Sequence, residues 1–441
     1  MLESSSKVHA RLSVICLWAL LTLAPDHILA EEKDQTARPT IGLVLSGGGA
    51  RGAAHAGVIK ALDDLQIPVD FIAGTSMGAV VGGLYASGMS ADELVEVIDT
   101  VNWPDLLTDR PPRGQRSFRR KSDDVGFMVD YDLGANKSGI VFPEGFIQGQ
   151  KLELALKRLV LPVIAVDDFD QLPIPFRAIA TDIVTGQAVV LDSGDLAQAM
   201  RASMSVPGLF KPVRRDGQIL VDGGVANNLP VKIVQDMGAD ILIVVDAGFP
   251  LLEEGDLTSA LALTKQMLTI LINGRAQEQI ELLSENDILI RPQLGNLESQ
   301  DFRRLGEALG LGLEAAQMSA ERLAPLSLPD SAYHAFRQHV ESGRRDAPII
   351  DNVVVENQSR LAPKVIEERL ADQRSSTGTG CNSPSSAQTQ QGPRSPSGAS
   401  SVTGAVSVLA TRIPPARTVF ALVCLNSLVA QRTLLTLKRI S

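Results

Sequence analysis

Two short apolar segments near the start of the chain each lead into a glycine-rich turn and then into residues with helical spacing. Residues 41–45 precede the first turn and residues 53–65 follow it; residues 69–73 precede the second and residues 77–87 follow it. Continuous apolar runs of this length are typical of strands buried in a parallel sheet. Strand, helix, strand, helix in this order predicts an α/β fold with a mainly parallel sheet and helices on both faces.

Further elements are expected in the rest of the first 346 residues, although the middle of the chain is less regular. Ser90 and Glu93 form a capping box that starts a helix running to about residue 101. Further strands are expected at residues 176–182, 187–191, 218–221 and 241–246, and long amphipathic helices at residues 257–285 and 302–323. We therefore expect one large domain over residues 41–346.

The second glycine turn reads Gly74-Thr75-Ser76-Met77-Gly78. A serine between small residues, after a strand and before a helix, is the arrangement of a nucleophile elbow, in which the hydroxyl projects above the sheet edge. A plain strand-to-helix turn with small residues is the alternative, because G-x-S-x-G also occurs by chance. The functional interpretation makes Ser76 a nucleophile.

The first glycine turn, Gly47-Gly48-Gly49-Ala50-Arg51-Gly52, also fits the dinucleotide pattern G-x-G-x-x-G. That pattern expects an acidic residue at the end of the next strand, whereas Asp70 lies at its start. A Walker loop is excluded because no Gly-Lys-Ser/Thr follows. Backbone amides around Gly47, Gly48 and Gly49 would instead face an oxyanion beside the serine. We assign Arg51 to this oxyanion hole, where it would add positive charge or brace the loop; a salt bridge is the alternative role.

A third motif, Val221-Asp222-Gly223-Gly224, ends a predicted strand. Asp-Gly is a common turn pair, but a nucleophilic serine also needs a base within hydrogen-bond reach. The chain has five histidines, and the one near the motifs, His55, lies in the helix that leaves the glycine loop, beyond the oxyanion donors. A dyad of Ser76 and Asp222 is therefore the economical interpretation.

In this order and spacing, the three motifs resemble those of the patatin-like phospholipase family. The resemblance covers residues 41–246, including the glycines at 47–49, 52, 74, 78, 223 and 224. It implies hydrolysis of lipid carboxylic esters with Ser76 as nucleophile, Asp222 as base, an oxyanion hole around the glycine loop, and no metal or cofactor. The partner would be a lipid or phospholipid substrate.

The first thirty residues predict a secretory signal peptide, followed by a polar linker over residues 31–40. Lys7 and Arg11 precede an apolar run at residues 12–23, and Ile28-Leu29-Ala30 precedes Glu31-Glu32. A membrane anchor is the alternative, but the run is shorter than the roughly 20 residues that a spanning helix needs. We expect export, to the periplasm or beyond.

Composition changes towards the C-terminus. Residues 347–372 resemble the start of a polypeptide-transport-associated (POTRA) domain, which in some exported relatives leads to an outer-membrane domain. From residue 373 to the end there is no acidic residue, and residues 375–401 are rich in Ser, Thr, Gly, Gln and Pro. We expect residues 373–441 to be disordered, or not to be native coding sequence.

The net charge and the composition of the chain limit the classes of binding partner. The formal net charge of −10 and an aromatic content of 4% argue against a nucleic-acid binder. A basic segment at residues 110–121 would meet anionic lipid headgroups, or it would be a solvated loop. The alternatives from other classes are a non-catalytic secretion or adhesion module on a lipase scaffold and, more remotely, a nucleotide-binding enzyme. Oligomeric state is left open.

Overall fold

The computed structural model describes residues 38–109, 134–136, 139–141, 144–344, 352–357, 406–411 and 419–422. The chain divides into two compact units, Met1–Arg345 and Asp346–Ser441. The predicted signal peptide, most of the linker and the basic segment at residues 110–121 lie outside the described residues. Every residue singled out for chemistry in the three motifs lies in the first unit.

An eight-stranded sheet forms the centre of the first unit, in the order β12-β11-β1-β2-β6-β10-β9, with β7 also paired to β6. Its five strands from β12 to β6 run parallel, and β10, β9 and β7 are antiparallel to their neighbours. The predicted α/β fold with a mainly parallel sheet is confirmed. The strands are β1 (Ile41–Leu45), β2 (Phe71–Thr75), β6 (Phe176–Asp182), β7 (Ala188–Leu191), β9 (Val213–Arg215), β10 (Gln218–Asp222), β11 (Ile241–Val245) and β12 (Ile288–Ile290).

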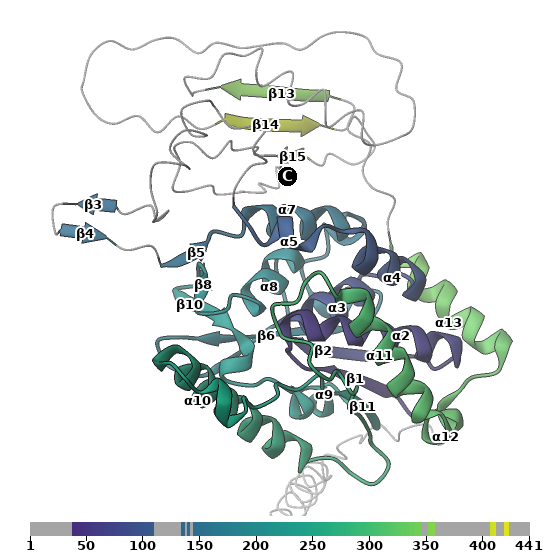
Figure 1. Ribbon diagram of the computed structural model, residues 1–441. Helices are drawn as coiled ribbons and strands as arrows, with labels where there is room; N and C mark the ends of the chain where they lie inside the picture. Colours follow the sequence, from purple (N-terminus) through teal and green to yellow (C-terminus); the bar gives the residue numbers. More distant parts are fainter. Residues whose placement is uncertain are drawn as a thin grey trace, which may run out of the picture. The chain divides into compact units, whose positions relative to one another are not determined.

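Both faces of this sheet are covered, as alternate residues of strand β1 show by belonging to two different hydrophobic cores. Leu43 and Leu45 of β1 belong to the larger core, which includes residues of helices α2, α3, α4 and α11. Val44 belongs to a smaller core on the other face, which includes Val234 of α9 and Ala276 of α10. Figure 1 shows these helices around the central strands. Period-two alternation along a doubly covered strand explains why its sequence is apolar throughout.

Helix boundaries agree with most expectations and correct two of them. The capping box of Ser90 and Glu93 is present in both directions and starts α4. The helix expected over residues 257–285 is shorter, and that expected over 302–323 is two helices. The α-helices are α2 (Ala54–Asp64), α3 (Met77–Ala86), α4 (Ala91–Thr100), α5 (Trp103–Leu106), α7 (Gln150–Leu159), α8 (Leu196–Ser203), α9 (Val231–Asp236), α10 (Ala260–Ile280), α11 (Leu305–Met318), α12 (Ala320–Leu323) and α13 (Asp330–Ser342).

Helices α2 and α11 cross at two glycines. A Cβ atom at Gly57 would lie 2.0 Å from the carbonyl oxygen of Leu309, and one at Gly312 would lie 2.0 Å from that of Ala54. Any larger residue would push the two backbones apart. This close crossing fixes α2, which begins directly after the glycine loop, against the C-terminal part of the unit.

Short elements complete the description. β3 (Gly134–Asn136) pairs antiparallel with β4 (Gly139–Val141), and β5 (Gly145–Ile147) pairs parallel with β8 (Gly208–Phe210). Short 3-10 helices include η1 (Gly49–Ala53) and η5 (Gly223–Val225), which begin within two of the sequence motifs. Within the described part of the chain, no helix has both the length and the apolar character needed to cross a bilayer.

The second unit contains an antiparallel sheet of β13 (Asn352–Asn357), β14 (Val406–Thr411) and β15 (Val419–Leu422). Within residues 373–441, which the sequence predicts to be disordered or not to be native coding sequence, the structure describes two strands, β14 and β15. These two segments are mostly valine, leucine and other residues that favour strands, unlike the Ser- and Pro-rich residues before them. The average composition of residues 373–441 does not reveal these two short apolar segments.

Candidate active site

Ser76 stands at the sharp turn between β2 and α3. Its backbone has φ 54° and ψ −121°, a strained conformation for a residue with a side chain. The flanking glycines allow this turn to close: a Cβ atom at Gly74 would lie 2.4 Å from the carbonyl oxygen of Gly78, and one at Gly78 would lie 2.5 Å from that of Leu45. The structure therefore has the geometry of a nucleophile elbow at the predicted position.

Asp222 lies at the end of β10 and contacts Ser76 directly. The Ser76 hydroxyl donates a hydrogen bond of 2.6 Å to Oδ2 of Asp222, and the Gly224 amide donates one of 2.8 Å to Oδ1. Gly223 must be small, because a Cβ atom there would lie 2.2 Å from the carbonyl oxygen of Ile179. The structure thus brings together the serine and the aspartate that the sequence proposed as a dyad, 146 residues apart in the chain.

Burial changes the acidity of this aspartate. The Asp222 side chain is almost fully enclosed, and this burial raises its pKa to about 6, although the hydrogen bonds from Ser76 and Gly224 act in the opposite direction. Burial raises a carboxyl pKa because the charged form loses its hydration. A carboxylate with such a pKa is a much stronger base than an ordinary one, and it is still ionised at neutral pH.

The glycine loop packs against the elbow, but its amides are not equivalent. A Cβ atom at Gly47 would lie 3.2 Å from Cβ of Ser76, so this residue adjoins the serine. Its N–H, however, donates to the carbonyl oxygen of Asn228 at 3.2 Å. The prediction that the Gly47 amide faces an oxyanion is therefore not met, since that amide is already used. Gly48 and Gly49, the latter with φ 58°, are the remaining candidates.

Arg51 braces this loop. Its Nε donates to the carbonyl oxygens of Ala247 and Gly248 at 3.1 and 3.0 Å, and its Nη1 donates to that of Leu297 at 2.7 Å. Of the three roles considered for Arg51, the contacts match bracing. Its guanidinium binds backbone carbonyls and not the oxyanion position, so its assignment to the oxyanion hole is corrected in favour of a supporting role.

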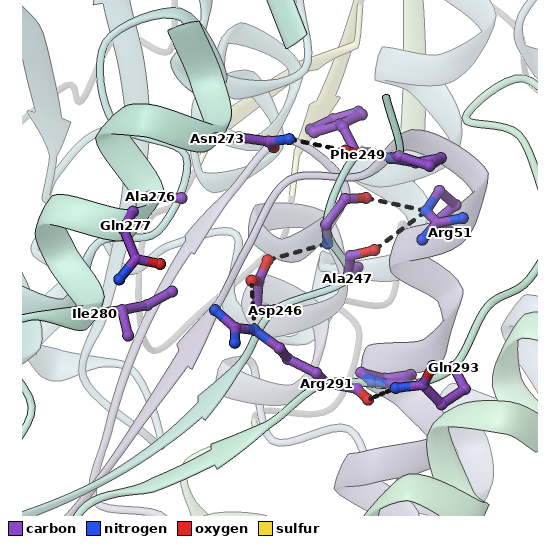
Figure 2. A pocket seen from close by; sticks show the side chains of 13 residues that line it. Arg51, Asp246, Ala247, Phe249, Asn273, Ala276, Gln277, Ile280, Arg291 and Gln293 are labelled. Carbon is purple, nitrogen blue, oxygen red and sulfur yellow. Dashed lines mark hydrogen bonds and ion pairs between the residues drawn. The ribbon is translucent and has the colours of Figure 1, made fainter. Parts of the chain in front are cut away.

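A cavity of about 360 Å³ lies next to Arg51, between α10 and the residues that follow β11 and β12. Figure 2 shows Asp246 beside Arg291 in it, and the two form an ion pair of 3.3 Å. Arg51 and Ala247 belong to the walls of this cavity, whereas Ser76 and Asp222 do not. It is therefore a space next to the glycine loop and is distinct from the dyad.

His55 does not reach the serine. It is completely buried in α2, and its Nε2 donates to the carbonyl oxygen of Ser46 at 2.7 Å. Burial lowers its pKa to about 4, against the opposing effects of the Ser46 hydrogen bond and of Asp246. The ring stays neutral at neutral pH and holds the residue just before Gly47. The geometry agrees with the expectation that His55 is not the base.

The rival use of the glycine loop finds no support in the structure. Asp70, the acid that the dinucleotide pattern would need, accepts hydrogen bonds of 2.7 Å from Nη1 and Nη2 of Arg38 and from the amide of Ile41. It therefore lies at the amino end of β1, whereas the glycine loop follows the carboxyl end. Among the residues that the structure describes, no group of three or more His, Cys, Asp or Glu side chains is placed to hold a metal ion.

Two residues near the dyad escaped the sequence reasoning. Ser203, at the end of α8, accepts a hydrogen bond of 2.8 Å from the Ser76 amide. Asn228 lies between Gly47 and Gly224, is 2% exposed, and has a side-chain oxygen with no hydrogen-bond partner. Neither stands in a recognisable motif. The only sequence signal is the polar residue type, and that signal is shared by many surface positions.

Comparison with known proteins identifies the domain. The family model of patatin-like phospholipases matches residues 43–234, so this part of the chain is a patatin-like phospholipase domain. An uncharacterized NTE family protein of Mycobacterium tuberculosis is 37% identical over 207 residues, which are 47% of this chain and 49% of that protein. Lysophospholipase NTE1 of Mycosarcoma maydis is 35% identical over 210 residues, 47% of this chain and 10% of that protein.

The chain thus spans about half the length of the mycobacterial relatives that it matches, and a smaller part of the fungal one. Among solved structures, VipD of Legionella pneumophila is similar with a TM-score of 0.36 and 17% identity, over 65% of this chain and 67% of that one. The domain resemblance stated from the motifs is confirmed by the family model; the resemblance of residues 347–372 to a POTRA domain stays a prediction.

Proposed function

We propose that this protein hydrolyses carboxylic esters of lipids through a dyad of Ser76 and Asp222 and a covalent acyl-enzyme. The observation that carries the proposal is the 2.6 Å hydrogen bond between the Ser76 hydroxyl and the buried Asp222 carboxylate at a strained elbow. A serine becomes nucleophilic when an adjacent base can take its proton, and this pair provides that contact. The patatin-like phospholipase domain and the lysophospholipase relative support a lipid substrate.

The reaction proceeds in two halves. Ser76 Oγ attacks the ester carbonyl carbon while its proton moves to Asp222 Oδ2. Collapse of the tetrahedral intermediate breaks the bond to the alcohol, which takes the proton from Asp222 and leaves. Water then attacks the acyl-enzyme, giving one proton to Asp222, and the second collapse returns that proton to Ser76 and releases the fatty acid. The raised pKa of Asp222 suits a group that must both accept and return a proton near neutral pH.

The developing oxyanion needs donors on the other side of the serine. The loop that contains Gly48 and Gly49 is a source of backbone amides beside the serine, because Gly47 packs on Ser76 while its own N–H binds Asn228. Arg51 fixes this loop through three carbonyl contacts. Removing one donor from such a site typically costs about 3 kcal/mol of transition-state stabilisation, so a rigid loop has a direct effect on rate.

An exposed apolar turn beside the dyad suits a lipid substrate. Val206 and Leu209 are 38% and 44% exposed, and they follow Ser205, whose carbonyl oxygen accepts the amide of Asp222. Apolar side chains at the rim of a hydrolase site gain free energy when they contact acyl chains instead of water.

The test is product identification with a dead control. The full chain and its Ser76→Ala variant are incubated with separate phospholipids, lysophospholipids and triacylglycerols, and the products are identified by mass spectrometry. We expect free fatty acid from at least one class with the wild type only, and a loss of turnover on the order of 10⁶ in the variant. Equal release by both proteins, or fluorophosphonate labelling at another serine, would contradict the assignment.

A further inference from the structure

The C-terminal end of α8 holds the backbone amides of both members of the dyad. The Ser203 hydroxyl accepts the Ser76 amide at 2.8 Å, and the Ser205 carbonyl oxygen accepts the Asp222 amide at 2.9 Å. Two residues apart in the chain, these groups are attached to the same turn of backbone. The separation of Ser76 from Asp222 is thus tied to one short structural element, although the two belong to different strand ends.

The elbow requires such support. The positive φ of Ser76 is a conformation that persists only where surrounding contacts enforce it. The Ser76 amide is buried, and without a partner it would be an unsatisfied donor. Ser203 also donates its own hydroxyl proton to the carbonyl oxygen of Ile179 in β6. Because that proton is committed to Ile179, the oxygen lone pairs of Ser203 face the Ser76 amide.

The end of α8 is itself rigidly held. Arg201 is 2% exposed, and its Nη1 donates to the Ser205 hydroxyl at 2.6 Å, which in turn donates to the Arg201 carbonyl oxygen at 2.8 Å. The guanidinium lies 4.7 Å from the ring centre of Phe210, and its Nη2 donates to the carbonyl oxygen of Lys211. The turn from residue 201 to 211 is therefore closed on itself by one buried cation.

We propose that Ser203 is a positioning residue that sets the orientation of Ser76 towards Asp222 and the substrate. The inference rests on the proposed function, since it assigns Ser203 a role in the same reaction. Its hydroxyl contacts the backbone of the nucleophile and not the reacting atoms, so it acts through Ser76. A displacement of reacting groups by about 1 Å is enough to reduce rates by about 10²-fold.

The experiment compares Ser203→Ala, Ser203→Cys and Ser203→Thr in the full chain. We measure kcat and KM on p-nitrophenyl butyrate, the rate of fluorophosphonate labelling at Ser76, and the melting temperature. In the alanine and cysteine variants we expect kcat and the labelling rate to fall 10- to 100-fold with KM within twofold. Threonine keeps the hydroxyl and should recover activity above that of cysteine.

The matched control is Ser87→Ala. Ser87 is also buried, at 3% exposure, and its hydroxyl donates to the Leu84 carbonyl oxygen at 2.6 Å at the other end of α3. This variant loses a comparable hydrogen bond away from the dyad, so its labelling rate should stay within twofold of the wild type.

Two results would overturn the positioning role. One is a folded Ser203→Ala protein that labels at the wild-type rate. The other is a loss of activity that follows only the loss of folded protein, with normal labelling of the fraction that remains folded. If alanine prevents folding, the cysteine variant, which fills the same space, is decided by the same criteria. A wild type that is not labelled at Ser76 would contradict the proposed function itself.

Discussion

Replacing Asp222 with asparagine should abolish hydrolysis and at the same time stabilise the folded protein. The amide cannot accept the Ser76 proton, so the first step of the proposed reaction is lost. The amide oxygen can still accept the Gly224 N–H, and the amide nitrogen can donate to the Ser76 hydroxyl, which keeps the site satisfied. The variant removes a buried charge, and that removal has a predictable effect on stability.

The magnitude follows from the pKa of Asp222. Burial raises it from 3.8 to about 6, and each unit corresponds to about 1.4 kcal/mol, so the ionised side chain costs the folded state about 3 kcal/mol relative to the neutral one. Because the folded pKa is the higher one, the stability that Asp222 contributes as a neutral acid is fully present below pH 3.8. It is lost as the pH rises through about 6. At pH 8 the variant avoids this cost.

Urea unfolding of both proteins at pH 8 and near pH 4 measures the effect. We expect the variant to be more stable by up to about 3 kcal/mol at pH 8, with the difference shrinking towards pH 4. The wild type should also lose hydrolytic activity below about pH 6, because a protonated Asp222 cannot act as base. Two results would contradict this reasoning: a variant less stable than the wild type at pH 8, or a stability difference that does not depend on pH. Either would mean that burial does not raise the pKa of Asp222.

Further predictions concern the surroundings of the dyad and the ends of the chain. His55→Gln should keep kcat within about tenfold, or about 1.4 kcal/mol, because an amide can still donate to the Ser46 carbonyl oxygen; a folded variant without measurable activity would contradict this. Arg51→Lys should lower kcat at least tenfold in a protein that still folds, because an ammonium cannot contact three carbonyl oxygens in the geometry of a guanidinium. An unchanged kcat would show that the glycine loop does not need this support. Deleting residues 346–441 should leave fluorophosphonate labelling of the first unit unchanged; a loss of labelling would show dependence on the second unit. We also propose export: protein recovered from the periplasm or medium should begin just after Ala30, and an uncleaved N-terminus would refute the signal peptide.

The elbow and the two glycine motifs could be predicted because each is a local solution to a steric problem. Gly78 approaches the backbone of Leu45 within a distance that excludes any side chain, so its identity is fixed by the turn. Such steric constraints appear in the sequence as glycines at fixed spacing, and a motif can therefore be recognised without the structure. The apolar run of β1, buried on both faces, likewise has a pattern that predicts a central strand.

The contacts that hold the site in place left no comparable signal. Ser203 lies 127 residues from Ser76 and at the end of an ordinary amphipathic helix, where a serine is unremarkable. The use of the Gly47 amide by Asn228 depends on a backbone carbonyl, which every residue has. The antiparallel course of β10 also had no signature, because strand direction is decided by connections and not by composition. Long-range pairing of common groups is visible only in three dimensions.

The pKa of Asp222 also decides which experiments can separate an aspartate base from a histidine base. An ordinary carboxylate would remain ionised well below pH 6, and an ordinary imidazole titrates near 6.5, so a pH profile would distinguish them. Burial raises the pKa of Asp222 to about 6 and lowers that of His55 to about 4, so the usual order of the two pKa values is reversed. A loss of activity near pH 6 would therefore be the signature of Asp222, and it would be mistaken for histidine if the structure were ignored. The decisive comparison is between variants: with His55→Gln the loss near pH 6 should remain, because the group that titrates there is still present. Disappearance of that loss in an active His55→Gln protein would assign the titration to His55 and refute the dyad.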